Sequence, residues 1–286
     1  MTLDPSHEFH YRVPHRSAGW RPGSHPGSSL GAGQEFISHG RLYDWPDPRR
    51  LDLRASLREV RGDWLVRIHR QRVSVPVHVI ADVSSSMRFG QRRTKLDVVA
   101  DFIEALGQGA FRVGDSLGLI AFDRHEREDL FMPALPSRGA GTLMAAALRR
   151  SEGSAGDITG LEEAASKLAG RAGLVFVASD FHFALERLDD VLDLLAPAFI
   201  VPMIVLDPAE LNPPQHDGLL VVQDAETGAR RTLWMRASVR ARWLDSVERR
   251  HVELDRLFAA RGIRTFRVCG AFDGEALSRY FFELSA

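Results

Sequence analysis

The sequence contains very little cysteine and very little lysine. Cys269 is its single cysteine, and Lys95 and Lys167 are its two lysines among 37 basic residues. A single cysteine excludes an internal disulfide and a thiolate zinc cluster, so we expect a reducing, cytoplasmic location. We attribute the preference for arginine to a GC-rich coding genome and not to a mechanism.

Net charge and long apolar runs are also scarce. The formal net charge of -1 argues against bulk electrostatic binding to nucleic acid or to an anionic membrane. The longest apolar run, at 196–206, is shorter than the roughly 18 residues that a membrane-spanning helix needs. The first residues also lack the apolar core of a signal peptide. We therefore expect a soluble protein with no membrane insertion and no nucleic-acid partner.

What the sequence does contain is a regular alternation of short apolar runs and segments of helical period. This alternation is typical of a mostly parallel sheet with helices on both faces. It predicts an α/β fold with a doubly wound, Rossmann-like sheet. The predicted strands are 75–81, 116–122, 173–179, 198–206 and 263–269, and the predicted helices are 94–109, 158–170, 183–196 and 237–262.

Three segments depart from this alternation. Residues 1–60 are rich in Gly, Pro, Ser and His in their first part, so we interpret them as a loop-like N-terminal extension that packs on one domain, 61–286. The histidines of the extension match no zinc-ligand spacing. Residues 62–70 and 218–236 read as antiparallel additions at a sheet edge, the second as a hairpin that turns near 226–228.

We expect the extension to pack through its large apolar side chains. These are Leu42, Tyr43, Trp45 and Leu51, which follow one another within a short stretch. No domain-length linker separates them from the first core strand, so a single folded unit is the simpler interpretation.

A cluster of oxygen-bearing side chains follows the first core strand. Asp82, Ser84 and Ser86 occupy alternate positions, so their oxygens can point to one side as the chain leaves the strand. In an open α/β sheet, ligands bind outside the carboxyl ends of the strands. Thr142 and Asp180 are candidates for the remaining oxygens, because each stands where another loop is expected to reach the same edge. One carboxylate with neutral hydroxyls suits Mg²⁺, with Ca²⁺ or Mn²⁺ as alternatives.

The motifs DVSSSM, GAGT and ASD, in this order, resemble the metal-ion-dependent adhesion site (MIDAS) of von Willebrand factor A (vWA) domains. Their flanks resemble the DUF58 family, including the methanol-oxidation accessory proteins called MxaS. The resemblance implies that Asp82, Ser84, Ser86, Thr142 and Asp180 hold one divalent cation. It also implies a non-enzymatic, chaperone-like role beside a MoxR-type AAA+ ATPase, in the assembly, metal insertion or activation of a larger enzyme complex such as methanol dehydrogenase.

The alternative is a metal-dependent phosphatase or phosphoryl-transfer enzyme in which Asp82 is the nucleophile. Such enzymes usually carry a second acid two residues later, where this chain has Ser84. The sequence also lacks the glycine-rich loops that cradle nucleotide phosphates. His182, two residues after Asp180, is a candidate for a supporting role beside the metal.

Overall fold

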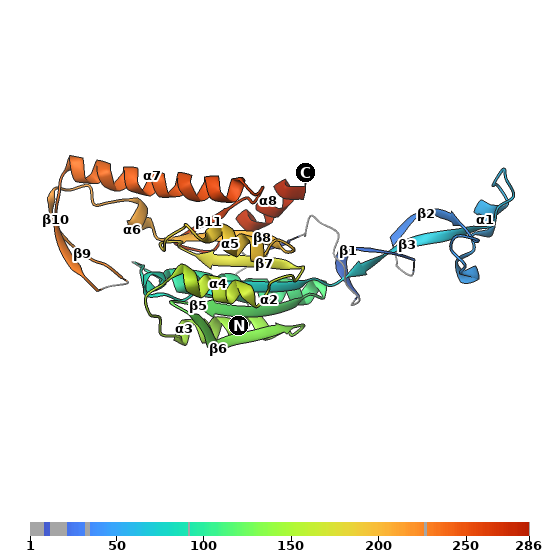
Figure 1. The fold of residues 1–286 in the computed structure, drawn as a ribbon, viewed down its shortest axis with the longest axis horizontal. Helices are drawn as coiled ribbons and strands as arrows, with labels where there is room; N and C mark the ends of the chain where they lie inside the picture. Colours follow the sequence, from blue (N-terminus) through green and yellow to red (C-terminus); the bar gives the residue numbers. More distant parts are fainter. Residues whose placement is uncertain (1–8, 12–21, 32–34, 91, 226–227, 286) are drawn as a thin grey trace.

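A six-stranded sheet forms the centre of the molecule (Figure 1). The computed structural model describes residues 9–11, 22–31, 35–90, 92–225 and 228–285. The strand order is β11-β8-β7-β4-β5-β6, and all neighbours are parallel except the antiparallel edge strand β6. The strands are β4 (Pro76–Asp82), β5 (Ser116–Phe122), β6 (Glu126–Leu135), β7 (Leu174–Ser179), β8 (Phe199–Leu206) and β11 (Phe266–Cys269).

Helices cover both faces of this sheet. One apolar cluster joins the sheet to α2 (Lys95–Val113), α3 (Ala140–Arg150) and α8 (Gly274–Ser285). A second cluster joins the opposite face to α4 (Ile158–Ser166), α5 (Leu188–Leu194) and α7 (Ala237–Ala259). The central strands read as continuous apolar runs because both of their faces are buried. The predicted doubly wound α/β fold is therefore confirmed.

Several elements of this domain were not predicted from the sequence, among them β6, α3 and α8. The first four residues of β6 are all charged and none of them is buried, so the segment lacks the apolar run of a central strand. Helix α3 is rich in alanine and has a glycine at its N-cap and another at its second residue, and we interpreted its first residues as a loop.

An arm of three antiparallel strands projects from the domain (Figure 1). It consists of β1 (Pro22–Gly31), β2 (Glu35–Arg41) and β3 (Leu65–Val73), with β3 in the middle and the short helices η2 (Pro48–Arg50) and α1 (Leu53–Ser56) between β2 and β3. The prediction of loop-like structure is thus wrong for β1 and β2. Their composition hides them, because both pair with β3, which follows only after η2 and α1, and strand formation depends on that context.

The arm differs from the packing that we expected. Tyr43, one of the side chains expected on the domain, is 94% exposed. Trp45 lines a small hollow within the arm together with Val66 and Ile68. The extension instead contacts the domain through Phe9 and Tyr11, which belong to the core cluster of α2, α3 and α8.

Asp115 fastens the base of the arm to the domain. It lies between α2 and β5, is 1% exposed, and accepts hydrogen bonds from three separate segments. The donors are the Tyr11 hydroxyl at 2.6 Å, the backbone N–H of Val75 at 2.7 Å, and His25, whose Nε2 lies 2.8 Å from Oδ2. A buried carboxylate with this many partners is a structural junction.

The predicted hairpin is confirmed as β9 (Gly218–Gln223) paired with β10 (Arg230–Met235). Within the described residues it forms a two-stranded sheet of its own and pairs with no strand of the central sheet, so the predicted place at the edge of that sheet was wrong. The chain reaches it from β8 through the short helix α6 (Pro208–Leu211). Within the described ranges, none of the helices combines the length and the apolar character needed to cross a bilayer.

Candidate metal centre

The candidate site lies where β4 and β7 end side by side. Asp82 is the last residue of β4, and Asp180 follows the last residue of β7. From β4 the chain continues to β5 on one side, and from β7 it continues to β8 on the other. Such a reversal of strand order opens a crevice at the carboxyl edge of the sheet, where ligands of α/β proteins bind.

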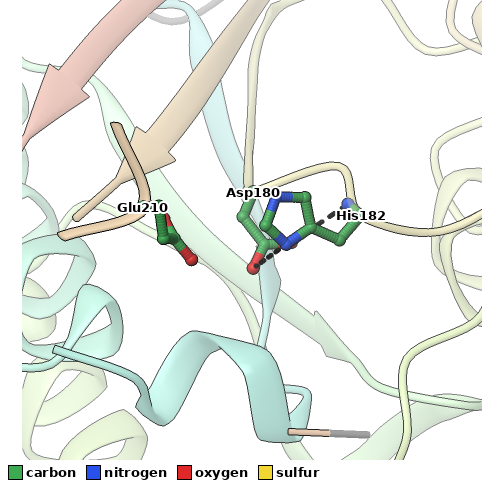
Figure 2. Close-up of side chains that lie close together, drawn as sticks. All are labelled: Asp180, His182 and Glu210. Carbon is green, nitrogen blue, oxygen red and sulfur yellow. Dashed lines mark hydrogen bonds and ion pairs between the residues drawn. The ribbon is translucent and has the colours of Figure 1, made fainter. Parts of the chain in front are cut away.

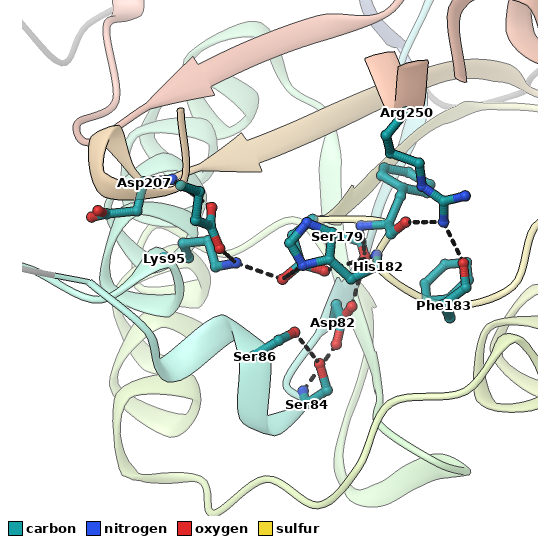
Figure 3. A network of polar contacts seen from close by, with 12 residues as sticks. Asp82, Ser84, Ser86, Lys95, Ser179, His182, Phe183, Asp207 and Arg250 are labelled. Carbon is teal, nitrogen blue, oxygen red and sulfur yellow. Dashed lines mark hydrogen bonds and ion pairs between the residues drawn. The ribbon is translucent and has the colours of Figure 1, made fainter. Parts of the chain in front are cut away.

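Asp82, Ser84 and Ser86 come together as their spacing predicted (Figure 3). The Ser84 backbone N–H donates to Oδ1 of Asp82 at 2.9 Å, and the Ser179 hydroxyl donates to Oδ2 at 2.6 Å. The hydroxyls of Ser84 and Ser86 lie 3.2 Å apart. Asp82 and Ser84 are each 1% exposed. These contacts fix the direction of the carboxylate and of both hydroxyls.

Asp180 joins the same group through a hydrogen bond with Ser86, and Lys95 connects it to Glu210. The Lys95 ammonium, on the first turn of α2, donates to Oδ2 of Asp180 and to Oε1 of Glu210, both at 2.6 Å. Glu210 belongs to α6, where it also accepts from the Asp207 backbone N–H in a capping box. A capping box also fixes the first turn of α2, from which the Lys95 side chain extends. The position of the ammonium is therefore set by this turn and by its two carboxylate partners.

His182 lies next to Asp180 (Figure 2). Its Nδ1 is 3.5 Å from Oδ2 of Asp180. Asp180, His182 and Glu210 each offer one ligand atom within 4.8 Å of the others. The His182 ring is about half exposed, whereas Asp180 is buried. The histidine therefore stands between the buried carboxylates and solvent.

The electrostatics of the group leave negative charge uncompensated. Burial raises the pKa of Asp82, and the neighbouring charge of Asp180 raises it further. Burial also opposes ionisation of Asp180, but His182, Lys95 and a hydrogen bond from Ser86 hold its pKa below the ordinary value. Three carboxylates, those of Asp82, Asp180 and Glu210, face one ammonium. Full ionisation of the three carboxylates would leave a surplus of negative charge beside the ammonium, which the raised pKa of Asp82 opposes.

The donor set fits a hard divalent cation. Carboxylate and hydroxyl oxygens are the ligands that Mg²⁺ and Ca²⁺ prefer. Asp82, Asp180, Ser84 and Ser86 supply such oxygens from the edge of two neighbouring strands. One divalent cation would offset the surplus charge. Lys95 would then act beside the cation, by holding one oxygen of Asp180.

The structure does not bring Thr142 to this group. Thr142 is exposed on the first turn of α3, and its hydroxyl lies 3.4 Å from the Glu104 carboxylate. That turn crosses the middle of α2, where a Cβ on Gly107 would lie 2.6 Å from the Cα of Gly141. Glu104 is nine residues along α2 from Lys95, a helical rise of about 13 Å. Including Thr142 in the site was wrong, because the GAGT segment begins helix α3, which crosses α2 away from Lys95 and the site.

The loop between α3 and α4 occupies the place where we expected the segment of Thr142. The backbone N–H of Ser85 donates to the carbonyl of Ser154 at 2.8 Å, and the Ser154 N–H donates to Asp123 at 3.2 Å. Gly153 passes so close that a Cβ there would lie 2.0 Å from the carbonyl oxygen of Val83. This loop, and not the start of α3, closes the third side of the site.

The loop after β7 is held in an unusual conformation. Phe181 has φ of 53°, a left-handed backbone that a bulky residue rarely adopts. Its ring is fully buried against Phe258 at 5.7 Å. Its N–H donates to the Ser179 hydroxyl, and the Arg250 guanidinium of α7 donates to the carbonyls of Phe181 and Phe183 (Figure 3). These contacts keep Asp180 and His182 directed toward the site.

Sequence reasoning missed Lys95, Ser179 and Glu210. The one signal for Lys95 was its rarity, since it is one of two lysines in an arginine-rich chain, and a point-like ammonium suits a compact buried site. Ser179 was included in a predicted strand, and Glu210 in no predicted element. Their roles follow from which segments meet.

Comparisons with known proteins identify the family. A family model described as "Protein of unknown function DUF58" matches residues 41–253. No curated protein sequence matches the chain. Among solved structures, an aerotolerance-related membrane protein from Bacteroides fragilis NCTC 9343 has 13% identity and a TM-score of 0.45, covering 73% of this chain and 98% of that one.

Two further solved structures are similarly distant. BatB from Bacteroides thetaiotaomicron has 14% identity and a TM-score of 0.42, covering 74% of this chain and 98% of its own. The PilB minor pilin from Streptococcus sanguinis has 12% identity and a TM-score of 0.37, covering 80% and 66%. Because the family model matches most of its length, the chain belongs to the DUF58 family.

Proposed function

We propose that this chain is an accessory protein that recognises a partner protein through a divalent cation. One observation carries the proposal. The buried carboxylates of Asp82 and Asp180 interact beside the hydroxyls of Ser84 and Ser86, and the Lys95 ammonium, which also pairs with Glu210, offsets only part of their charge. Such a group is costly without a counter-charge. We propose Mg²⁺ as the cation, with Ca²⁺ and Mn²⁺ as alternatives.

The side chains have distinct roles in this proposal. Asp82 and Asp180 would hold the cation, and Ser84 and Ser86 would add neutral oxygens. Lys95 keeps Asp180 in place. The cation supplies a position that an Asp or Glu carboxylate of a partner can fill. The protein's own residues orient and desolvate that position.

The nature of the partner rests on the resemblance of the metal motif to vWA domains and of its flanks to MxaS. That resemblance leads us to propose a MoxR-type AAA+ ATPase as the direct partner. The wider role would be assembly, metal insertion or activation of a larger enzyme complex. Membership of DUF58 and the position of the site at the strand-order reversal support this proposal.

The alternative of phosphoryl transfer by Asp82 has less support. The carboxylate is 1% exposed, and both of its oxygens accept hydrogen bonds. A nucleophile must reach the phosphorus atom in line with the leaving group, which this burial opposes. A phosphatase assay on magnesium-loaded protein, with Asp82→Asn as control, tests the alternative: turnover that disappears in the variant would favour the enzyme.

Calorimetric titration with Mg²⁺ tests the metal site. We expect Asp82→Ala to lower the Mg²⁺ affinity by about 100-fold or more and Ser84→Ala to lower it by about tenfold. Both variants should still fold. Ser85→Ala is the matched control, because the Ser85 hydroxyl faces the carbonyl of Ser154 and not the site. Equal affinity in the wild type and in the Asp82 and Ser84 variants would refute the assignment.

A pull-down with the purified ATPase, in magnesium and in chelator, tests the recognition mode. We expect binding in magnesium and its loss in chelator or with Asp180→Ala. Undiminished binding in chelator would show that the ATPase is recognised by another surface.

A further inference from the structure

A groove of about 600 Å³ lies between the hairpin, α7 and the loop after β7. Its lining combines apolar and cationic side chains. The apolar ones are Leu233 of β10 and Val239, Trp243 and Val247 of α7, and the cationic ones include Arg242 and Arg250.

The apolar floor is a part of α7 that the domain leaves uncovered. Val239, Trp243 and Val247 are four residues apart, so they form one stripe along the helix. Only Leu254 and Phe258, near the other end of α7, are fully buried among the helix residues. The Trp243 indole donates to the carbonyl of Glu210 at 2.7 Å, which fixes the ring at the edge of α6. The stripe is therefore ordered but only partly covered.

The charge around this floor has one sign. His182, Arg242 and Arg250 line the groove, and no carboxylate does, but Arg250 is paired with Glu253 of the same helix at 3.0 Å. Arg242 is exposed and forms no ion pair within the part of the chain that the structure describes. The first turn of α7 has no acidic residue, and its N-cap Arg236 makes no side-chain cap bond. The positive end of the helix dipole therefore adds to the arginine charge.

The groove adjoins the metal centre. His182 lines the groove, and its Nδ1 is 3.5 Å from Oδ2 of Asp180. Arg250 reaches from the groove to the carbonyl of Phe181, next to Asp180. A peptide that occupied the groove would pass the outer side of the buried carboxylates.

We propose that this groove binds an acidic segment of the partner protein. A large apolar side chain of the segment packs on Leu233, Trp243 and Val247, and an acidic side chain pairs with Arg242. Charge complementarity selects the occupant, since a cationic rim without carboxylates rejects basic segments. The inference rests on the proposed function, because the same segment would present the carboxylate that reaches the cation.

Selection from a displayed library of random 12-residue peptides tests this inference, with the full chain in magnesium as the target. We expect enriched peptides to combine Asp or Glu with an aromatic or leucine residue. The best peptide, made in soluble form, should bind the Arg242→Glu and Val247→Asp variants at least tenfold more weakly. Arg249→Glu is the control, because Arg249 pairs with Asp245 outside the groove and should bind unchanged.

The same peptide separates this inference from the metal-dependent mode. Arg242→Glu should keep the wild-type Mg²⁺ affinity, whereas Asp82→Ala should lose it. Peptide binding that survives chelator but fails in Arg242→Glu would support the groove and contradict recognition through the cation. Failure to enrich any peptide, enrichment of basic peptides, or equal binding by Arg242→Glu and wild type would overturn the groove.

Discussion

The two ends of the central sheet each bury aspartate, with opposite results. At the amino end, Asp115 accepts hydrogen bonds from Tyr11 and Val75 and contacts His25, so its oxygens are satisfied by the protein itself. At the carboxyl end, Asp82 and Asp180 share a site with one ammonium and carry surplus charge.

The difference teaches how a structural carboxylate can be told from a functional one. Both kinds are buried, so burial alone does not distinguish them. A structural carboxylate has donors that match its lone pairs and tie distant segments together. A carboxylate group with more charge than its protein partners offset calls for an external cation.

Asp115→Ala should have the largest effect on stability. It would leave the Tyr11 hydroxyl and the Val75 N–H without their buried acceptor, at a cost of about 4 kcal/mol in the free energy of unfolding. Urea denaturation measures this loss, and calorimetry should find the Mg²⁺ affinity unchanged. Asp245→Ala, at an exposed ion pair, is the control and should cost less than about 1 kcal/mol. A lost Mg²⁺ affinity in Asp115→Ala would break the comparison between the two ends.

Lys95→Met should come next. Removing the buried ammonium leaves Asp180 and Glu210 without their shared partner, which should cost about 3 kcal/mol of stability in chelator. Mg²⁺ should restore part of that loss, because the cation then supplies positive charge in place of the ammonium. Thermal unfolding with and without Mg²⁺ checks both expectations.

The other lysine provides the control for this experiment. Lys167 pairs with Glu126 at the surface, so Lys167→Met should cost at most about 1 kcal/mol, with no dependence on Mg²⁺. If the two lysine variants lost the same stability, the carboxyl end of the sheet would not depend on the buried ammonium of Lys95.

His78 of β4 lies between the two ends of the sheet, and its contribution to the pH dependence of stability can be separated from theirs. Burial, and then the charge of Arg171, lower its pKa to about 4 from an ordinary value of 6.5. The unfolded chain therefore binds more protons between these values, so stability is full above pH 6.5 and falls as the pH drops toward 4. We expect about 2 kcal/mol of loss between pH 7 and pH 5.

Urea denaturation of wild type and His78→Gln at both pH values isolates this contribution. The variant should lack that part of the pH dependence, and what remains would come from other groups, including those at the two sheet ends. An identical pH dependence in both proteins would contradict the assignment to His78.

Tyr11→Phe should have the smallest effect. The change removes one of the three partners of Asp115 and should cost about 1 kcal/mol. Chemical denaturation measures it against Tyr43→Phe, since the Tyr43 ring is 94% exposed and should tolerate the change freely. A larger loss for Tyr43→Phe would show that the arm is held to the domain elsewhere.

Much of the fold could be predicted because local patterns determine it. The apolar runs of β4, β5, β7 and β8 predict buried parallel strands, and the helical period predicts α2, α4 and α7. The arm could not be predicted this way, since β1 and β2 become strands only by pairing with β3. Its base depends on Asp115, whose donors come from residues far apart in the chain.

The same division applies to the candidate site. Asp82, Ser84 and Ser86 belong to one segment, so their spacing along the backbone already places their oxygens together, and the position of Asp180 follows from the end of the neighbouring strand. Which other segments complete the site depends on how the helices pack. The close crossing of α2 and α3 places Thr142 beside Glu104 and away from the site. The first turn of α2 places Lys95 between Asp180 and Glu210. Sequence alone therefore determined the strand-end motif, whose residues are close together along the chain. Tertiary packing decided its partners, because residues from distant segments meet without any regular spacing in the sequence that would predict the contact.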